Sequence, residues 1–476
     1  MPESLGHKVI NGTIWATIDR IGTMALQFIV NLILARLLMP EDFGYIGMLA
    51  IFISVSQTLV DGGFGSALIQ KKEPTQTDYS TIFYWNLIFS VILYAILYIS
   101  APYVAYFFKL PLLGKILRVL GLTLIVNSFI IVQNNRLRKQ LAFRRIAIIN
   151  ISSYIIAAII AIWLAYKGFG VWSLVIMQIM YGVFQNCLLW GIVRWFPDLT
   201  FSFDSLKKLF GFGGYLLAAN ILQVICQNMQ GIIIGRKFSA VQMGFYSQAK
   251  KLDDVSSNAL PNIIVQVIYP VYSQFQNDKQ KLQKLLGMSI RIISFFIFPL
   301  MLLLILIAEP LIVFLYGEKW LTCAPYFQIL CVGGIFVCLQ NINYYAVAAV
   351  GKSDALFRWS FYKWGVLLAV LLVGSHWGIY GILVGMVMSS MNIFVVNAIL
   401  THRFVGYSLL NQFRDFMPIL AISCLSFAGS YAVTHYFEDA HCIIVVLVFF
   451  VLYLLFTVVF RKKIITDIVQ IKMIST

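Results

Sequence analysis

The sequence predicts an all-α protein that crosses a membrane about fourteen times. Of its 476 residues, 61% are hydrophobic and only 11% are charged, whereas charged residues make up about a quarter of ordinary soluble domains. Apolar runs of about 20 residues or more recur along the whole chain, and each is long enough to cross a hydrocarbon core of roughly 30 Å as a helix. The polar breaks between these runs are short, so the sequence predicts no separate soluble domain.

The expected spans follow from these runs. They lie near residues 10–37, 43–69, 79–108, 113–135, 145–167, 169–195, 209–235, 241–272, 285–316, 322–350, 355–374, 377–401, 415–436 and 441–460.

The formal net charge of +16 would suggest a nucleic-acid partner in a soluble chain. Here, however, most lysines and arginines fall in the short loops that follow every second span, and these loops lie on the same side of the membrane. This distribution is typical of cytoplasmic loops in multi-pass proteins. It predicts that both termini face the cytoplasm, and we expect no nucleic-acid partner.

An internal repeat is visible at an offset of 200 residues. Arg36 with Gly44 eight residues later recurs as Arg236 with Gly244. Six helices per copy place both copies in the same orientation, as expected for two bundles related by an axis along the membrane normal. The sequence therefore predicts two pseudo-symmetric six-helix bundles, 1–200 and 201–405, followed by a helix pair and cytoplasmic tail, 406–476. Chance similarity between leucine-rich helices is the alternative explanation.

Charged groups inside the spans are candidate functional residues, because burying a charge in lipid is costly. Arg20 lies about 12 residues into the first span, which is about 18 Å at 1.5 Å per residue. Asp61 lies near the inner end of the second span, and Asp19 adjoins Arg20. We expect Arg20 to meet a phosphate, with Asp61 or Asp19 taking a coupling cation or holding Arg20 in place. A structural Arg20–Asp61 ion pair is the alternative.

Polar residues extend this pattern along two helices. Thr23, Gln27 and Asn31 share a face with Arg20, and the residues at the repeat offset are also polar or small. Amides both donate and accept hydrogen bonds, which suits a hydroxyl-rich ligand, although hydrogen bonding between packed helices is the alternative. The equivalent stripe on the seventh span comprises Asn220, Gln223, Gln227 and Gly231.

The eighth span is too polar to face lipid, and we expect it to line water. It contains Lys250, Lys251, Asp253 and Asp254, and Lys250 is spaced to pair with Asp254. For Arg291 and Lys363, which also fall within spans, we expect the long side chains to reach the membrane surface. The resulting lumen is near neutral or slightly basic, which favours an anionic substrate.

No catalytic or metal site is expected. The five histidines fall at span ends or in loops without forming a cluster, and the seven cysteines contain no CxxC pair. We therefore expect no cofactor other than a possible coupling H⁺ or Na⁺.

The order of several segments resembles the polysaccharide-exporter and O-antigen flippase branch of the multidrug/oligosaccharidyl-lipid/polysaccharide (MOP) exporter superfamily. The resemblance runs along the whole chain and is carried by Gly12 to Arg20, Leu34 to Gly44 and Val60 to Gln70. It implies a flippase that moves an undecaprenyl-diphosphate-linked oligosaccharide from the cytoplasmic to the periplasmic leaflet of the bacterial inner membrane. It also implies that Arg20 receives the diphosphate and that the last two helices form a groove for the lipid tail.

The resemblance further implies membrane lipid, a polysaccharide polymerase and other assembly proteins as partners. A cation-coupled multidrug antiporter of the same superfamily would share the fold, but should present acidic residues to its cargo. A non-transporting subunit of an assembly complex is a further alternative. An enzyme would need paired carboxylates or a histidine near the bilayer surface, so we expect none.

Overall fold

The structure, a computed structural model, describes residues 5–259, 268–436 and 442–460. These residues are almost entirely helical and contain no strand, so the predicted all-α membrane fold is confirmed. The chain divides into two compact units, Met1–Gly244 and Phe245–Thr476. The bundle boundaries at residues 200 and 405 were predicted from the sequence repeat. This division into units does not test them, so they stay a prediction.

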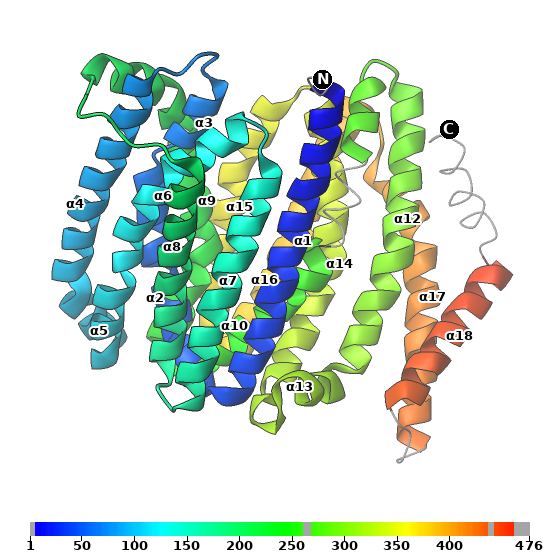
Figure 1. Cartoon of the computed structure of the whole chain (residues 1–476). Coiled ribbons are helices and arrows are strands. Elements are labelled where there is room, and N and C mark those ends of the chain that lie inside the picture. Colours follow the sequence, from blue (N-terminus) through cyan, green and yellow to red (C-terminus); the bar gives the residue numbers. More distant parts are fainter. Residues whose placement is uncertain (1–4, 260–267, 437–441, 461–476) are drawn as a thin grey trace. The chain divides into compact units, whose positions relative to one another are not determined.

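The first unit contains the helices up to the start of α10 (Figure 1). Their bounds are α1 Leu5–Leu37, α2 Pro40–Asp61, α3 Phe64–Gln70, α4 Gln76–Phe108, α5 Pro111–Leu120, α6 Leu122–Lys139, α7 Phe143–Tyr166, α8 Val171–Val193, α9 Phe203–Lys237 and α10 Ala240–Asp254.

The second unit begins within α10. It holds the π-helix η1 Val255–Ala259, α12 Lys279–Leu306, α13 Ala308–Tyr316, η2 Glu318–Trp320, α14 Cys323–Ala349, α15 Ser353–Gly374, η3 Ser375–Trp377, α16 Gly378–Val405, α17 Leu409–Tyr436 and α18 Cys442–Phe460.

Twelve segments of the described chain are long and apolar enough to cross a membrane, and one of them, Ser353–Val405, comprises both α15 and α16. The predicted eighth span includes residues 260–267, which lie outside the described residues. The predicted count of about fourteen is therefore neither confirmed nor contradicted.

Several predicted spans are interrupted helices. The second span breaks into α2 and α3 at Gly62 and Gly63, whose φ angles of 58° and 72° lie in the left-handed region that glycine adopts without strain. The fourth span breaks between α5 and α6 at Gly121, and the ninth ends its first helix at Leu306 before α13 begins. Hydropathy alone does not reveal these breaks, because the apolar run continues through them.

Local signals set other helix ends. Pro40 opens α2, and the Met39 backbone N–H donates to the Asp42 carboxylate at 2.9 Å. At the start of α4, Thr75 and Asp78 form a reciprocal capping box, with N–H to side-chain oxygen distances of 3.2 and 2.7 Å. Such caps satisfy the otherwise unpaired N–H groups of the first turn.

The 200-residue offset recurs in the helix bounds. α1 and α9 end at Leu37 and Lys237, and α2 and α10 begin at Pro40 and Ala240. The same helix–turn–helix is thus built twice.

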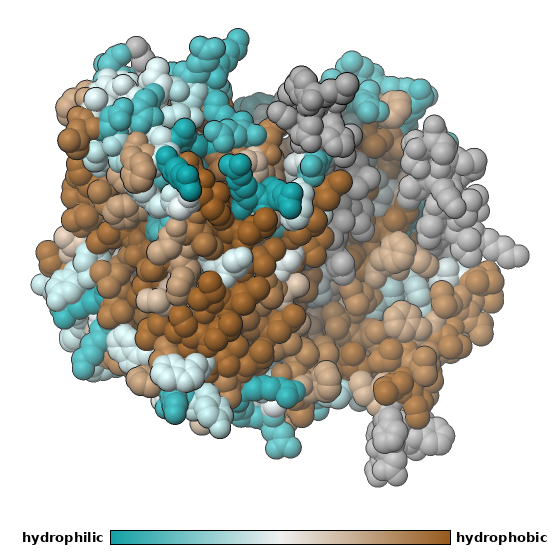
Figure 2. Space-filling model, viewed as in Figure 1, coloured by the Kyte–Doolittle hydropathy of each residue, from teal (hydrophilic) through white to brown (hydrophobic). Residues whose placement is uncertain are grey.

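Within the first unit, α1 packs on α7, α7 on α8, and α2 on α9. Its viewed face carries a broad hydrophobic band, with hydrophilic residues gathered toward the helix ends (Figure 2). Within the second unit, α16 packs on α14 and α15, and α17 joins α12 to α18. An apolar band between two polar rims is the surface that a bilayer requires.

Candidate functional site

The predicted polar face of α1 is turned away from the helix that α1 packs against. α1 meets α7 at Gly12 and Gly22, where an added Cβ would lie 3.0 Å from the Phe143 ring and 3.3 Å from Ile151. Arg20 and Gln27 are exposed. No hydrogen bond or ion pair engages Arg20 in the described part of the chain, so its guanidinium keeps all its donors for a ligand.

Asp19 lies on the α7-facing side, about 100° around the helix from Arg20, since an α-helix has 3.6 residues per turn. The Asn150 side-chain N–H₂ on α7 donates to both Asp19 carboxylate oxygens at 3.1 Å, and Thr23 donates to Oδ1 at 3.4 Å. Gln185 on α8 in turn donates to the Asn150 carbonyl at 2.8 Å. This chain of hydrogen bonds ties α1 to α7 and α8.

Asp61 ends α2 and is engaged away from Arg20. It accepts a hydrogen bond from the backbone N–H of Gly63, and the positive charge of Arg138 acts on it. A Cβ on Gly65 would lie 3.2 Å from Asp61 Oδ1 and 2.7 Å from Asn135 Nδ2. No ion pair joins Asp61 to Arg20 in the described structure, so that alternative is not supported.

The stripe on α9 is also exposed. Asn220, Gln223 and Gln227 are exposed and make no hydrogen bond within the described residues, which argues against a role in bonding neighbouring helices. The same face continues to Gly231 and Gly235, where an added Cβ would lie 2.7 Å from the Gly47 carbonyl oxygen and 2.6 Å from Met48. The stripe therefore packs on α2 at one end and is open along the rest.

Lys250 on α10 is neutralised by two neighbours. Its Nζ lies 2.9 Å from Asp254 Oδ1, the partner that the i,i+4 spacing predicted, and 2.7 Å from Asp253 Oδ2, which was not predicted. The Ser257 hydroxyl donates to Asp253, whose side chain is buried. Lys251 is exposed. In this conformation Lys250 offers an anion little net charge.

In the second unit, Arg291 on α12 pairs with a residue of a neighbouring helix, whereas the sequence predicted that its side chain extends to the membrane surface. Its Nη1 lies 2.7 Å from Asp415 Oδ1 on α17, and the Tyr407 hydroxyl donates to Asp415 Oδ2. Burial raises the pKa of Tyr407 well above its usual range, and the hydrogen bond to Asp415 acts in the same direction. The cluster links α17 to α12.

Lys363 on α15 also differs from the prediction. It is buried rather than extended to the surface, and its Nζ donates to Asn397 Oδ1 on α16.

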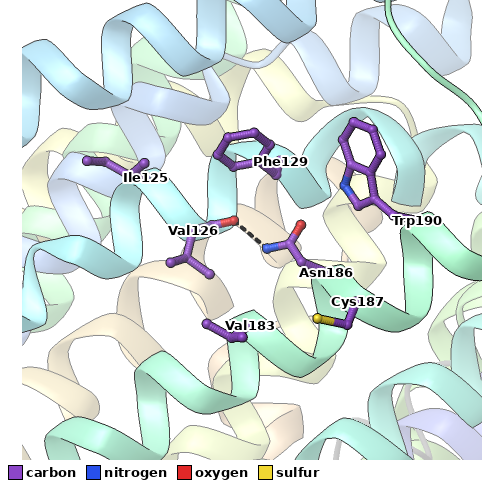
Figure 3. A pocket seen from close by; sticks show the side chains of 7 residues that line it. All are labelled: Ile125, Val126, Phe129, Val183, Asn186, Cys187 and Trp190. Atoms are coloured by element: carbon purple, nitrogen blue, oxygen red, sulfur yellow. Dashed lines mark hydrogen bonds between the residues drawn. The ribbon is translucent and has the colours of Figure 1, made fainter.

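An open pocket lies between α6 and α8 (Figure 3). It is lined by Ile125, Val126, Phe129, Val183, Asn186, Cys187 and Trp190. The Asn186 amide donates to the Val126 carbonyl at 2.7 Å, which leaves an apolar lining that holds none of the predicted site residues. A polar ligand would find few partners here.

The chain was compared with known proteins. A family model described as "Polysaccharide biosynthesis protein" matches residues 33–325, more than half of the chain. The succinoglycan biosynthesis transport protein ExoT of Rhizobium meliloti is 27% identical over 88% of this chain and 83% of its own length. The lipopolysaccharide biosynthesis protein WzxC of Escherichia coli is 24% identical over 84% of this chain and 81% of its own length. The teichuronic acid biosynthesis protein TuaB of Bacillus subtilis is 25% identical over 77% of this chain and 75% of its own length.

Solved structures show the same fold at low sequence identity. The lipid II flippase MurJ, in an inward closed conformation, aligns with a TM-score of 0.75 and 14% identity, covering 95% of this chain and all of its own (100%). The MATE multidrug transporter DinF-BH aligns with a TM-score of 0.54 and 16% identity, covering 84% and 96%.

Proposed function

Because this chain belongs to the polysaccharide biosynthesis protein family, within the MOP exporter superfamily, we propose that it flips an undecaprenyl-diphosphate-linked oligosaccharide from the cytoplasmic to the periplasmic leaflet. One relative is named as a transport protein of succinoglycan biosynthesis and another as a lipopolysaccharide biosynthesis protein, and the chain shares its fold with a lipid II flippase. The mechanism we propose is alternating access, coupled to an ion gradient.

The observation that carries the proposal is the open polar face of α1. Arg20 is exposed within a span yet has no acidic partner among the described residues. Placing a charge at this depth in a membrane costs free energy, so such residues usually serve a function. A guanidinium binds phosphate oxygens through paired N–H groups. Arg20 would therefore hold the diphosphate.

The amides on the two stripes supply the sugar contacts. Gln27 and Asn31 on α1, with Asn220, Gln223 and Gln227 on α9, can each donate to and accept from sugar hydroxyls. In the second unit, we propose Lys250 and Lys251 as further substrate-binding residues. Lys250 would contribute positive charge when a conformational change separates it from Asp253 or Asp254.

The acidic residues then have positioning roles. Asp19 holds α1 against α7 through Asn150, Asp61 fixes the turn at Gly63, and Asp253 and Asp254 set the charge of Lys250. None of the four pairs with Arg20, which leaves that side chain to the substrate.

We further propose that the protein resides in a bacterial inner membrane with both termini in the cytoplasm, as the distribution of basic loops predicts. A polysaccharide polymerase acting on the delivered oligosaccharide would be its functional partner. A multidrug antiporter is the less supported alternative, because the matching family model and the relatives reported above carry names from polysaccharide biosynthesis.

The test is deletion of the gene followed by analysis of lipid-linked intermediates. We expect one defined oligosaccharide on a diphosphate lipid to accumulate, with its sugar protected from probes added to the outer face of the inner membrane. Re-expression of the wild-type gene should clear it. A deletion strain with unchanged lipid-linked intermediates and full surface polysaccharide would contradict the proposed function.

A further inference from the structure

Lys363 is a basic side chain buried in the middle of a membrane span. It lies midway along the 22-residue helix α15, about 15 Å from the start of the helix at 1.5 Å per residue. The residue is only 8% exposed. Its ammonium therefore cannot reach the aqueous surface, the usual solution for lysine near a helix end.

The contacts of Lys363 come from two helices, α14 and α16, which pack against each other and against α15 in the second unit (Figure 1). Its Nζ donates to Asn397 Oδ1 on α16. The Asn397 amide N–H₂ donates to the Gln340 backbone carbonyl on α14 at 3.0 Å, which orients Oδ1 toward the lysine. The Tyr344 ring on α14 lies 5.8 Å from Nζ. All these partners are neutral.

Among the described residues, no carboxylate contacts Lys363 to neutralise its charge. α14 and α16 contain no Asp or Glu. The acidic residue of α15 is Asp354, which lies in the first turn and pairs with Arg358 at 2.9 Å. The other titratable groups on α15 and on the elements packed against it are Tyr362 on α15, Cys323, Tyr326, Cys331, Cys338 and Tyr345 on α14, Tyr380, His402 and Arg403 on α16, and His376 on η3.

This sets Lys363 apart from the other buried charges. Asp78 and Asp253 are the two further acidic or basic residues that are similarly buried in the described part of the chain. Asp78 pairs with Lys71 and Asp253 with Lys250. Lys363 has only an amide and an aromatic ring.

An ammonium buried without a counter-ion is costly, and a lysine can relieve that cost by losing a proton. The site is also able to accept the charged form. The Gln340 backbone carbonyl accepts from Asn397, and the side-chain oxygen of the same residue is buried without a hydrogen-bond partner, so α14 carries an unused acceptor on a residue that contacts Asn397. The amine can thus be held in either protonation state, depending on which side of the membrane has access to it.

We propose that Lys363 is the proton-binding site that couples transport to the proton gradient. The proposal rests on the proposed function and names its coupling ion. A proton entering from the periplasm binds the amine lone pair to give the ammonium, and the same proton leaves to the cytoplasm when access changes. One N–H bond forms and the same bond breaks in each cycle, with export of the anionic lipid-linked sugar in the opposite direction.

The first measurement asks whether Lys363 exchanges a proton at all. Melting temperatures of purified wild-type protein and Lys363→Met are compared at pH values from 6 to 9, with exposed Lys167→Met as the matched control. We expect the difference between wild type and Lys363→Met to change with pH, and the difference for the control to stay constant. A pH-independent difference for Lys363→Met would overturn the proposal. Lys363→Gln serves as a second variant if Lys363→Met does not fold.

The second measurement tests coupling. Proteoliposomes carry the lipid-linked oligosaccharide from the deletion strain, the membrane potential is clamped at zero, and a gradient of one pH unit is imposed. With one proton per cycle, the leaflet distribution of the sugar should shift about tenfold, since a pH unit is equivalent to a factor of ten in an equilibrium constant. Lys363→Met and Lys363→Arg should equilibrate the leaflets without this shift, and Lys167→Met should behave as wild type.

A Lys363→Met protein that shifts the distribution as the wild type does would overturn the proton site. If wild-type protein moves no lipid-linked sugar even without a gradient, the proposed function fails instead. The melting experiment would still decide whether Lys363 binds and releases a proton.

Discussion

Gly44 on α2 and Gly244 on α10 occupy reciprocal positions in one close helix contact. A Cβ on Gly44 would lie 1.8 Å from the carbonyl oxygen of Ala240, and a Cβ on Gly244 would lie 1.8 Å from the carbonyl oxygen of Pro40. Both pairs are related by the 200-residue offset of the repeat. The two copies of the helix–turn–helix therefore touch backbone to backbone, at a place where only glycine leaves enough room.

Replacing either glycine should force the two helices apart. We expect Gly44→Ala and Gly244→Ala each to cost about 1–3 kcal/mol, the usual range for overpacking, because the clashing atom is backbone and cannot rotate away. The loss is measured as a fall in the melting temperature of the purified protein. Gly191→Ala on α8 is the control, since nothing lies within 4 Å of its added Cβ. Variants that melt like the wild type would show that the helices separate easily here.

The features that were predicted correctly from the sequence depend on residues that are close together in the chain. The repeat offset appears again in the helix bounds because the turns before Pro40 and Ala240 are built alike. The pairing of Lys250 with Asp254 was predicted because residues four apart share a helix face.

Partners supplied by distant segments were not predicted. Asn150 is 131 residues from Asp19, and Asp415 is 124 residues from Arg291. Amides and acids occur throughout the chain, and nothing in their spacing says which one folds against which helix. The burial of Lys363 was missed for the same reason, since its environment is made by Asn397 and Tyr344 on other helices.

Arg20 provides the sharpest test of substrate binding. We expect Arg20→Ala to abolish surface polysaccharide while the protein is still inserted and stable, because Arg20 has no structural partner among the described residues to lose. Arg20→Lys should retain part of the activity, since it keeps the charge but not the paired N–H geometry. Surface glycan and membrane protein levels are measured together.

Arg145→Ala is the matched control for Arg20, because this exposed arginine at the start of α7 is also without a side-chain partner in the described structure. Full surface glycan in the Arg20→Ala strain would contradict the assignment of Arg20 to the substrate.

Asp19 should act on stability rather than on binding alone. Asp19→Ala leaves the Asn150 amide without its acceptor. An unsatisfied buried donor costs about 1–3 kcal/mol, and we expect a loss toward the lower end because this contact is only partly buried. Asp19→Asn keeps an acceptor and should cost less. Melting temperatures of Asp19→Ala, Asn150→Ala and the double variant form a cycle that isolates the pairwise term. We expect the double variant to lose less than the sum of the singles; strict additivity would mean that the two side chains do not interact.

The ion pair between Arg291 and Asp415 should stabilise the attachment of α17 to α12. Removing one member of a fully buried pair costs about 3–5 kcal/mol, because the other charge is left without a partner. Here the side chains remain 13% and 18% exposed, so we expect a smaller loss for Arg291→Met or Asp415→Leu. The double variant should recover part of the loss, since it leaves neither charge uncompensated.

The chain supplies its own control in Arg358 and Asp354, an ion pair at 2.9 Å whose side chains are 74% and 68% exposed. Exposed pairs contribute only about 0–1 kcal/mol, so Arg358→Met should barely change the melting temperature. If Arg291→Met is equally silent, the α12–α17 contact does not depend on this ion pair. A clear loss for Arg291→Met, partly restored by Asp415→Leu, would identify the ion pair as the link between the two helices.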